Sequence, residues 1–151
     1  MDNEGLAYMA GFFDGEGCVC ITPIGRVTSR QSQTFSMRAQ VVSTNKEIIE
    51  LWKDSFGGDI KSRKIGGNRQ ACWVWRISAK QAAVVLGLML PYLKIKKPQA
   101  QRAIEFQEHK TRGGRKGLGY IDYEHKVKDK FSTMNRRGRD AMIAHGLIAA
   151  I

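Results

Sequence analysis

The chain has 151 residues, 42% of them hydrophobic, which is enough for a buried core and is typical of one domain. Its 25 lysines and arginines against 14 acidic residues give a net charge of +11, which favours a polyanionic partner such as nucleic acid. The sequence contains no run of about eighteen apolar residues, so we expect no membrane-spanning helix and no membrane partner.

The first element is a helix of apolar and small residues over 5–17, GLAYMAGFFDGEG, which ends in the triplet Gly15-Glu16-Gly17. An acid at the C-terminal end of a helix is unfavourable beside the helix dipole. A bound divalent cation would remove this conflict, because it prefers hard oxygen ligands. Three- and four-residue spacings predict one face of small residues that lets another helix approach closely, made by Ala7, Ala10, Gly11 and Asp14.

Two segments with period-two alternation follow, over 18–24 and 34–43, and predict an antiparallel hairpin. The alternation directs one set of side chains toward a core: Val19, Ile21, Pro23, Phe35, Met37, Ala39 and Val41. The other set is an ordinary solvated face or a surface that reads base edges in a DNA major groove. With the loop between the strands it comprises Cys20, Thr22, Ile24, Arg26, Thr28, Arg30, Thr34, Ser36, Arg38 and Gln40.

A helix over 46–56, capped by Thr44 or Asn45 and ended by two glycines, leads to a second hairpin over 59–65 and 71–78. We interpret Trp73 and Trp75 as core residues rather than as stacking platforms for bases, because polar residues alternate with them. The outward set of this hairpin is Lys61, Arg63, Gln70, Cys72, Val74 and Arg76.

The last third of the chain predicts helices over 79–90, 98–108, 122–134 and 140–151, with Ser78 as an N-cap and a basic glycine-rich loop over 111–119. A basic turn follows the third of these helices. It contains Asn135, Arg136, Arg137 and Arg139, and by composition alone it is a flexible solvated tail.

The three cysteines, Cys18, Cys20 and Cys72, have neither a CxxC pair nor the spacing of a zinc site. Cys18 and Cys20 are two residues apart in a predicted strand, where the geometry opposes a mutual disulfide. Reduced thiols in a soluble intracellular protein are therefore expected.

The stretch GLAYMAGFFDGEG resembles the signature helix of the LAGLIDADG homing endonucleases, and LKIKKPQA over 93–100 resembles a later segment of that family. The resemblance implies an α+β fold of the αββαββα type over 1–151, with further C-terminal helices and the basic loop from about residue 110. Its antiparallel, saddle-shaped sheet would bind DNA on one face and carry helices on the other. It also implies that Glu16 and the Gly15 carbonyl bind metal, and that Lys96 assists catalysis, with Lys94 and Lys97 as alternatives. The basic turn over 135–139 resembles the phosphate-contacting loop of the family's homodimeric branch, which implies DNA contact there.

Because the motif occurs once, the resemblance implies a homodimer that pairs its signature helices and cuts a long, pseudo-palindromic DNA site with Mg²⁺, leaving short 3′ overhangs. Mn²⁺ and Ca²⁺ are alternative occupants. The expected locations are a chloroplast, a mitochondrion or a prokaryotic cytoplasm.

Two residues depart from the family pattern: Ser43 stands where glutamine is frequent, and Glu47 where a basic residue is common. They leave room for a second reading, a non-cleaving group I intron RNA maturase or a DNA-binding relative. A basic structural RNA-binding protein is a third.

Overall fold

The computed structural model describes residues 1–25, 27–28, 33–64, 70–110 and 118–135. Along this part of the chain the elements are α1 (Asn3–Glu16), β1 (Gly17–Ile24), β2 (Thr34–Ser43), α2 (Lys46–Phe56), β3 (Asp59–Arg63), β4 (Cys72–Ser78), α3 (Ala79–Met89), α4 (Lys97–His109) and α5 (Leu118–Met134). Within these ranges no helix is both long and apolar enough to cross a membrane. The predicted turn at 66–68 and the helix over 140–151 fall outside the described residues.

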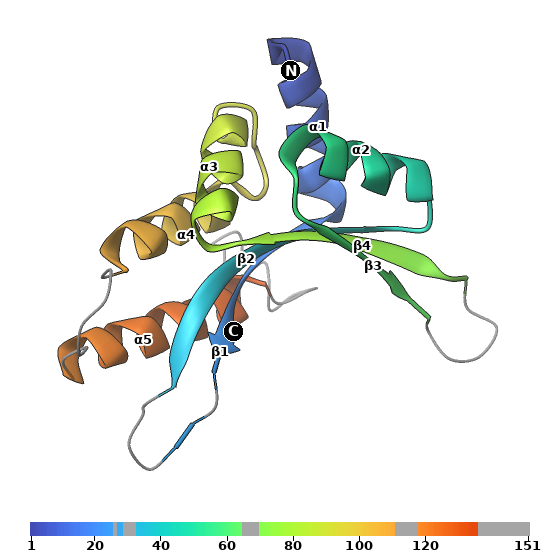
Figure 1. Cartoon of the computed structure of the whole chain (residues 1–151). Coiled ribbons are helices and arrows are strands. Elements are labelled where there is room, and N and C mark those ends of the chain that lie inside the picture. The colour runs from blue at the N-terminus through green and yellow to red at the C-terminus, as the bar shows by residue number, and fades with distance from the viewer. Residues whose placement is uncertain (26, 29–32, 65–69, 111–117, 136–151) are drawn as a thin grey trace, which may run out of the picture.

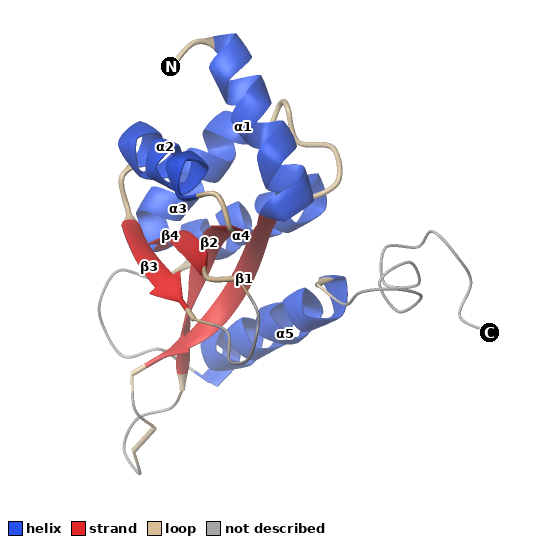
Figure 2. Ribbon diagram, turned by 90° about the vertical axis from the view of Figure 1, so that its right-hand side faces the viewer, coloured by secondary structure: helices blue, strands red, loops and turns tan. Residues whose placement is uncertain are grey.

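The strands form one antiparallel sheet in the order β1-β2-β4-β3. The sheet is strongly curved, with α1, α2, α3 and α4 on one side of it (Figure 1). Helix α5 crosses the arm formed by β1 and β2, and its Phe131 is buried in the same core as the side chains under the other helices (Figure 2). This α+β arrangement confirms the predicted fold, in which helices cover one face of the sheet.

The core-facing alternation of the first hairpin is confirmed for Val19, Ile21, Phe35, Met37, Ala39 and Val41, all of which are buried. Pro23 is a wrong prediction, because it is exposed. It lies toward the far end of the β1–β2 arm, which extends past the helices that cover the rest of the sheet (Figure 1).

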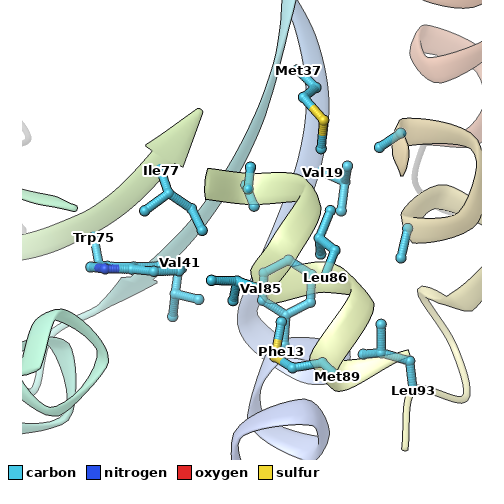
Figure 3. Close-up of a cluster of buried hydrophobic side chains, with 14 of the residues drawn as sticks. Phe13, Val19, Met37, Val41, Trp75, Ile77, Val85, Leu86, Met89 and Leu93 are labelled. Atoms are coloured by element: carbon cyan, nitrogen blue, oxygen red, sulfur yellow. The ribbon is translucent and has the colours of Figure 1, made fainter. Parts of the chain in front are cut away.

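Aromatic and aliphatic side chains join the helices to the sheet (Figure 3). The rings of Trp52 and Trp75 lie 4.7 Å apart, and Trp52 also contacts Phe13 at a centroid distance of 6.0 Å. The Trp75 indole donates a hydrogen bond of 2.7 Å to the Gly57 carbonyl. The core interpretation therefore holds for Trp75, whereas Trp73 is only partly buried at the edge of this core.

Local signals fix most of the element ends. The side chain of Asn45 accepts a hydrogen bond of 3.3 Å from the Ile48 amide and caps α2, whereas Ser78 makes no such bond at the start of α3. Gly57 and Gly58 both have positive φ, which allows the sharp exit from α2 into β3. Helix α5 begins at Leu118, earlier than predicted, so the predicted loop is shorter at its C-terminal end.

Candidate nucleic-acid interface and catalytic groove

Asp14 joins two segments that are distant in the sequence. Its carboxylate accepts backbone hydrogen bonds from Lys94 (2.7 Å), Ile95 (3.1 Å) and Lys96 (2.8 Å). In the opposite direction, the Lys96 ammonium donates to the Asp14 carbonyl. The C-terminal end of α1 is thereby attached to the N-terminal end of α4. Asp14 thus has a structural role inside the chain.

This attachment brings the predicted catalytic residues into one open groove of about 1050 Å³. Gly15, Glu16 and Lys96 line it, whereas Lys94 and Lys97 are not among the lining residues. The Glu16 side chain is exposed, and Lys96 is half-buried beside the helix end. Three predicted DNA-contacting residues from the sheet, one just before β4 and one at the end of α5 line the same groove: Gln40, Arg63, Cys72, Gln70 and Asn135.

The groove offers a metal ion only part of a coordination shell. Among the described residues, histidine, cysteine, aspartate and glutamate form no group of three that could hold a metal. The Glu16 carboxylate and the Gly15 carbonyl are oxygen donors of the kind that Mg²⁺ and Ca²⁺ prefer. The remaining ligands would have to come from outside the described chain, such as DNA phosphates, water or a second copy. The donor types therefore suit a hard divalent cation.

The uncovered face of the sheet carries the predicted DNA-contacting side chains. Cross-strand pairing places Cys20 opposite Arg38, Gln40 opposite Arg76 and Lys61 opposite Val74, so all belong to one face. Thr22, Ile24, Thr34 and Ser36 continue this face along the arm, and Arg63 and Cys72 continue it at the edge. Its described basic residues come from three strands, which suits contact with a phosphate backbone.

Two residues of this face are less accessible than predicted. Cys72 is only 5% exposed, because its thiol is turned to the Arg63 carbonyl of the adjoining strand at 3.6 Å. Ser36 is also buried, with its hydroxyl directed at the Met37 carbonyl. Cys72 and Ser36 are therefore corrected from contact residues to structural ones.

The remaining predicted contacts are divided between described and undescribed parts of the chain. Thr28 is exposed in the loop between the strands of the first hairpin. The Asn135 amide donates a hydrogen bond of 2.7 Å to the Val19 carbonyl and so attaches the end of α5 to the edge strand. The predicted contacts that lie outside the described residues are Arg26, Arg30, Arg136, Arg137 and Arg139.

The Cys20 thiol of β1 is held in its uncharged state. A side-chain hydrogen bond with Cys18 and then burial raise the pKa of the Cys20 thiol far above its ordinary value. Arg38, its cross-strand neighbour, lowers the pKa but is outweighed. Cys20 therefore presents a neutral surface beside the positive charge of Arg38.

The exposed side of α1 differs from the predicted one. Ala10 is fully buried in its own core, which contradicts its assignment to a surface for a second helix. Ala7 and Gly11 are exposed, and so are their helical neighbours Tyr8 and Gly15. A Cβ on Gly11 or Gly15 would meet nothing within 4 Å. The small-residue surface is thus rotated toward Gly15.

The two departures from the family pattern have separate explanations. The Ser43 hydroxyl accepts a hydrogen bond of 3.1 Å from the Asn45 amide, which orders the turn into α2. Glu47 is exposed and lines a second groove, of about 370 Å³, between α1 and α2, with Tyr8 and Ile48. Glu47 is therefore not among the residues that line the groove containing Glu16, whereas Ser43 lines both grooves.

Gln99 is a buried polar groove residue that the sequence interpretation missed. Gln99 lies on the first turn of α4, is only 5% exposed and lines the groove with Glu16 and Lys96. The available signal was its position three residues after Lys96, which places both on one helical face.

Comparison with known proteins gives two concordant results. The family model described as LAGLIDADG endonuclease matches residues 9–111. The homing endonuclease I-CvuI, solved in complex with its target in the presence of Ca, is 18% identical over 95% of this chain and 90% of that chain, with a TM-score of 0.74. The archaeal intron-encoded homing endonuclease I-Vdi141I, complexed with DNA, is 14% identical over 97% of this chain and 98% of that chain, with a TM-score of 0.75.

The I-LtrWI LAGLIDADG homing endonuclease, bound to target DNA, is 14% identical with a TM-score of 0.69, over 86% of this chain but only 45% of that chain. A search of curated proteins gave no match. At these identities the solved structures establish the shared fold. The family model spans more than half of the sequence, and the chain therefore belongs to the LAGLIDADG endonuclease family.

Proposed function

We propose that this protein is a site-specific DNA endonuclease that hydrolyses both strands of a long, nearly palindromic target as a homodimer with bound Mg²⁺, and leaves short 3′ overhangs. The observation that carries the proposal is the groove in which Glu16, Gly15 and Lys96 meet at the border of the basic sheet face. Two solved structures with this fold, those of I-CvuI and I-Vdi141I, are complexes with DNA, and the I-CvuI complex was determined in the presence of Ca.

The homodimer follows from the number of acids and from the surface of α1. Each chain brings one exposed groove carboxylate, Glu16, and one sheet that would cover half of a long site. In both views the N-terminal part of α1 extends away from the sheet (Figure 1, Figure 2). Pairing of two such helices through Ala7, Gly11 and Gly15 would place the two Glu16 residues near a two-fold axis. A two-fold protein reads a two-fold DNA sequence.

In the proposed mechanism, Glu16 and the Gly15 carbonyl hold the metal, which when bound activates water and stabilises charge on the phosphate. Lys96 adds positive charge at the same groove and is kept in place by Asp14. Arg38, Lys61 and Arg76 on the sheet face supply phosphate contacts and base-edge contacts that set affinity and sequence preference.

A randomised DNA library incubated with Mg²⁺ tests the activity and identifies the target. Wild-type protein should produce discrete cuts at one near-palindromic sequence. Glu16→Gln should abolish the cuts while leaving DNA affinity within about threefold, because it removes a metal ligand and no DNA contact. Glu108→Gln is the matched control, since it neutralises an exposed carboxylate on α4 that does not line the groove and should leave both properties unchanged. Loss of binding together with cleavage in Glu16→Gln would argue against the metal-ligand role.

The dimer is tested by replacing a glycine that has free space in the single chain. Gly11→Leu should leave the fold intact, because a Cβ there meets nothing within 4 Å, but should block close helix pairing. Light scattering should then show half the wild-type mass. A dimeric Gly11→Leu variant would place the interface elsewhere.

Ser43 and Glu47 favour a second candidate, a group I intron RNA maturase or a DNA-binding relative without cleavage. The library experiment separates the two. A folded dimer that binds structured RNA tightly and makes no DNA cuts would support the second candidate.

A further inference from the structure

The side-chain oxygen of Gln99 is buried and has no hydrogen-bonding partner among the described residues. Its side chain lines the groove that contains Glu16 and Lys96, and the residue is only 5% exposed. Among the described residues, no group hydrogen-bonds to its Oε1 atom. A buried acceptor left unpaired is unfavourable, so such an atom in a native protein calls for a ligand or an ordered water.

The lack of a partner has an identifiable cause in the structure. Gln99 is the third residue of α4, and Lys96 is the N-cap. At this position a glutamine commonly reaches back to the N-cap backbone N–H. Here the Lys96 N–H donates instead to the Asp14 Oδ1 atom at 2.8 Å. The Asp14 attachment therefore leaves the Gln99 oxygen without its usual local partner, on a residue that lines the groove.

The surroundings of Gln99 suit a bound water molecule. The groove is open, and an ordered water needs two to four polar partners. Lys96 and Glu16 on the same groove provide a donor and an acceptor, and the Gln99 oxygen provides a second acceptor. Ser43 also lines the groove, but its hydroxyl already accepts a hydrogen bond from the Asn45 amide.

We propose that Gln99 is a positioning residue that orients the attacking water in phosphodiester hydrolysis; this inference rests on the proposed endonuclease function. One hydrogen of the water is held by the Gln99 Oε1 atom and stays on the oxygen. The water oxygen forms the new bond to phosphorus and releases its other proton to solvent. The bond from phosphorus to the leaving sugar oxygen breaks at the same time. The leaving oxygen takes a proton from solvent, so the net change is the addition of one water across the phosphodiester.

Gln99→Met tests the proposal, because methionine keeps the length of the side chain and removes the acceptor. The substrate is the duplex recovered from the library selection. Binding should stay within about threefold, and the single-turnover cleavage rate at saturating protein should fall about 100-fold. The unfolding midpoint without DNA should rise by about 2–4 °C, since the acceptor has no protein partner and its water is fixed in place only when DNA closes the groove. A merely structural glutamine would instead give a lower midpoint.

Gln107→Met is the matched control. Gln107 also lies on α4 and also has a buried Oε1 atom without a partner in the described chain, but it does not line the groove. Its replacement should raise the midpoint similarly and leave the cleavage rate unchanged.

The outcomes are separable. A wild-type protein that cleaves while Gln99→Met cleaves equally fast would overturn the role of Gln99 and leave the proposed function standing. A lower midpoint for Gln99→Met, or equal rate losses in both variants, would also overturn it. A wild-type protein that cuts no DNA in the library would overturn the proposed function and this inference with it.

Discussion

Replacement of Asp14 by alanine is the most informative perturbation of the fold and the site together. The change removes the acceptor of three backbone hydrogen bonds, from Lys94, Ile95 and Lys96. Two of these bonds are at exposed positions, where water replaces the carboxylate, and the third is partly buried. With about 0.5–1.5 kcal/mol for each bond and values near the low end for the exposed pair, Asp14→Ala should reduce the free energy of unfolding by about 2 kcal/mol.

Urea unfolding measures this change, and it corresponds to a fall in the thermal midpoint of about 4–8 °C for a protein of this size. Hydrogen exchange shows which part of the chain loses stability. The amides of Lys94, Ile95 and Lys96 should exchange faster in Asp14→Ala than in the wild type, whereas the amide of Trp75 in the central part of the sheet should change only with the global stability. Cleavage should weaken as well, because Lys96 loses its fixed position beside Glu16.

Asp2→Ala is the control for a lost carboxylate on the same helix. Asp2 caps the opposite end of α1 through one exposed hydrogen bond of 2.8 Å to the Gly5 amide. Its loss should cost about 1 kcal/mol and leave the 94–96 amides as protected as before, relative to the global stability. Unchanged stability and unchanged exchange at 94–96 in Asp14→Ala would refute the structural role of Asp14.

Three further predictions concern single contacts. Gly17→Ala should lower stability by about 1–3 kcal/mol in urea unfolding, because the added Cβ would lie 2.6 Å from a backbone oxygen of α1, whereas Gly15→Ala has free space and should lose none. Glu124→Ala should cost at least about 1–3 kcal/mol by the same measurement, since it removes the buried acceptor of the Phe35 amide; equal stability would contradict this. The raised pKa of Cys20 leaves little thiolate at pH 8, so mass spectrometry after iodoacetamide treatment should show its alkylation at least about tenfold slower in the folded protein than in urea; equal rates would refute the pKa direction.

Local patterns in the sequence were sufficient for most of the fold. Period-two alternation identifies which side of β2 is buried, because successive side chains in a strand point to opposite faces whatever surrounds them. The polar residue Asn45 and the Gly57-Gly58 pair mark the ends of α2 through hydrogen bonding and backbone conformation that involve only near neighbours. The signature motif likewise identified Glu16, since an acid between two glycines at a helix end is a local feature.

The tertiary structure alone decided which side of α1 is buried and what its acids contact. Apolar and small residues occur on nearly every side of α1 itself. The sequence of the helix therefore could not show that Ala10 enters the core while Gly11 stays exposed. The bonds of Asp14 span about 80 residues of sequence, and they in turn leave Gln99 without its local partner. Sequence periodicity fixes the relative directions of side chains within one element. Only the packing of elements against each other fixes which direction is inside and which distant backbone groups a carboxylate can reach.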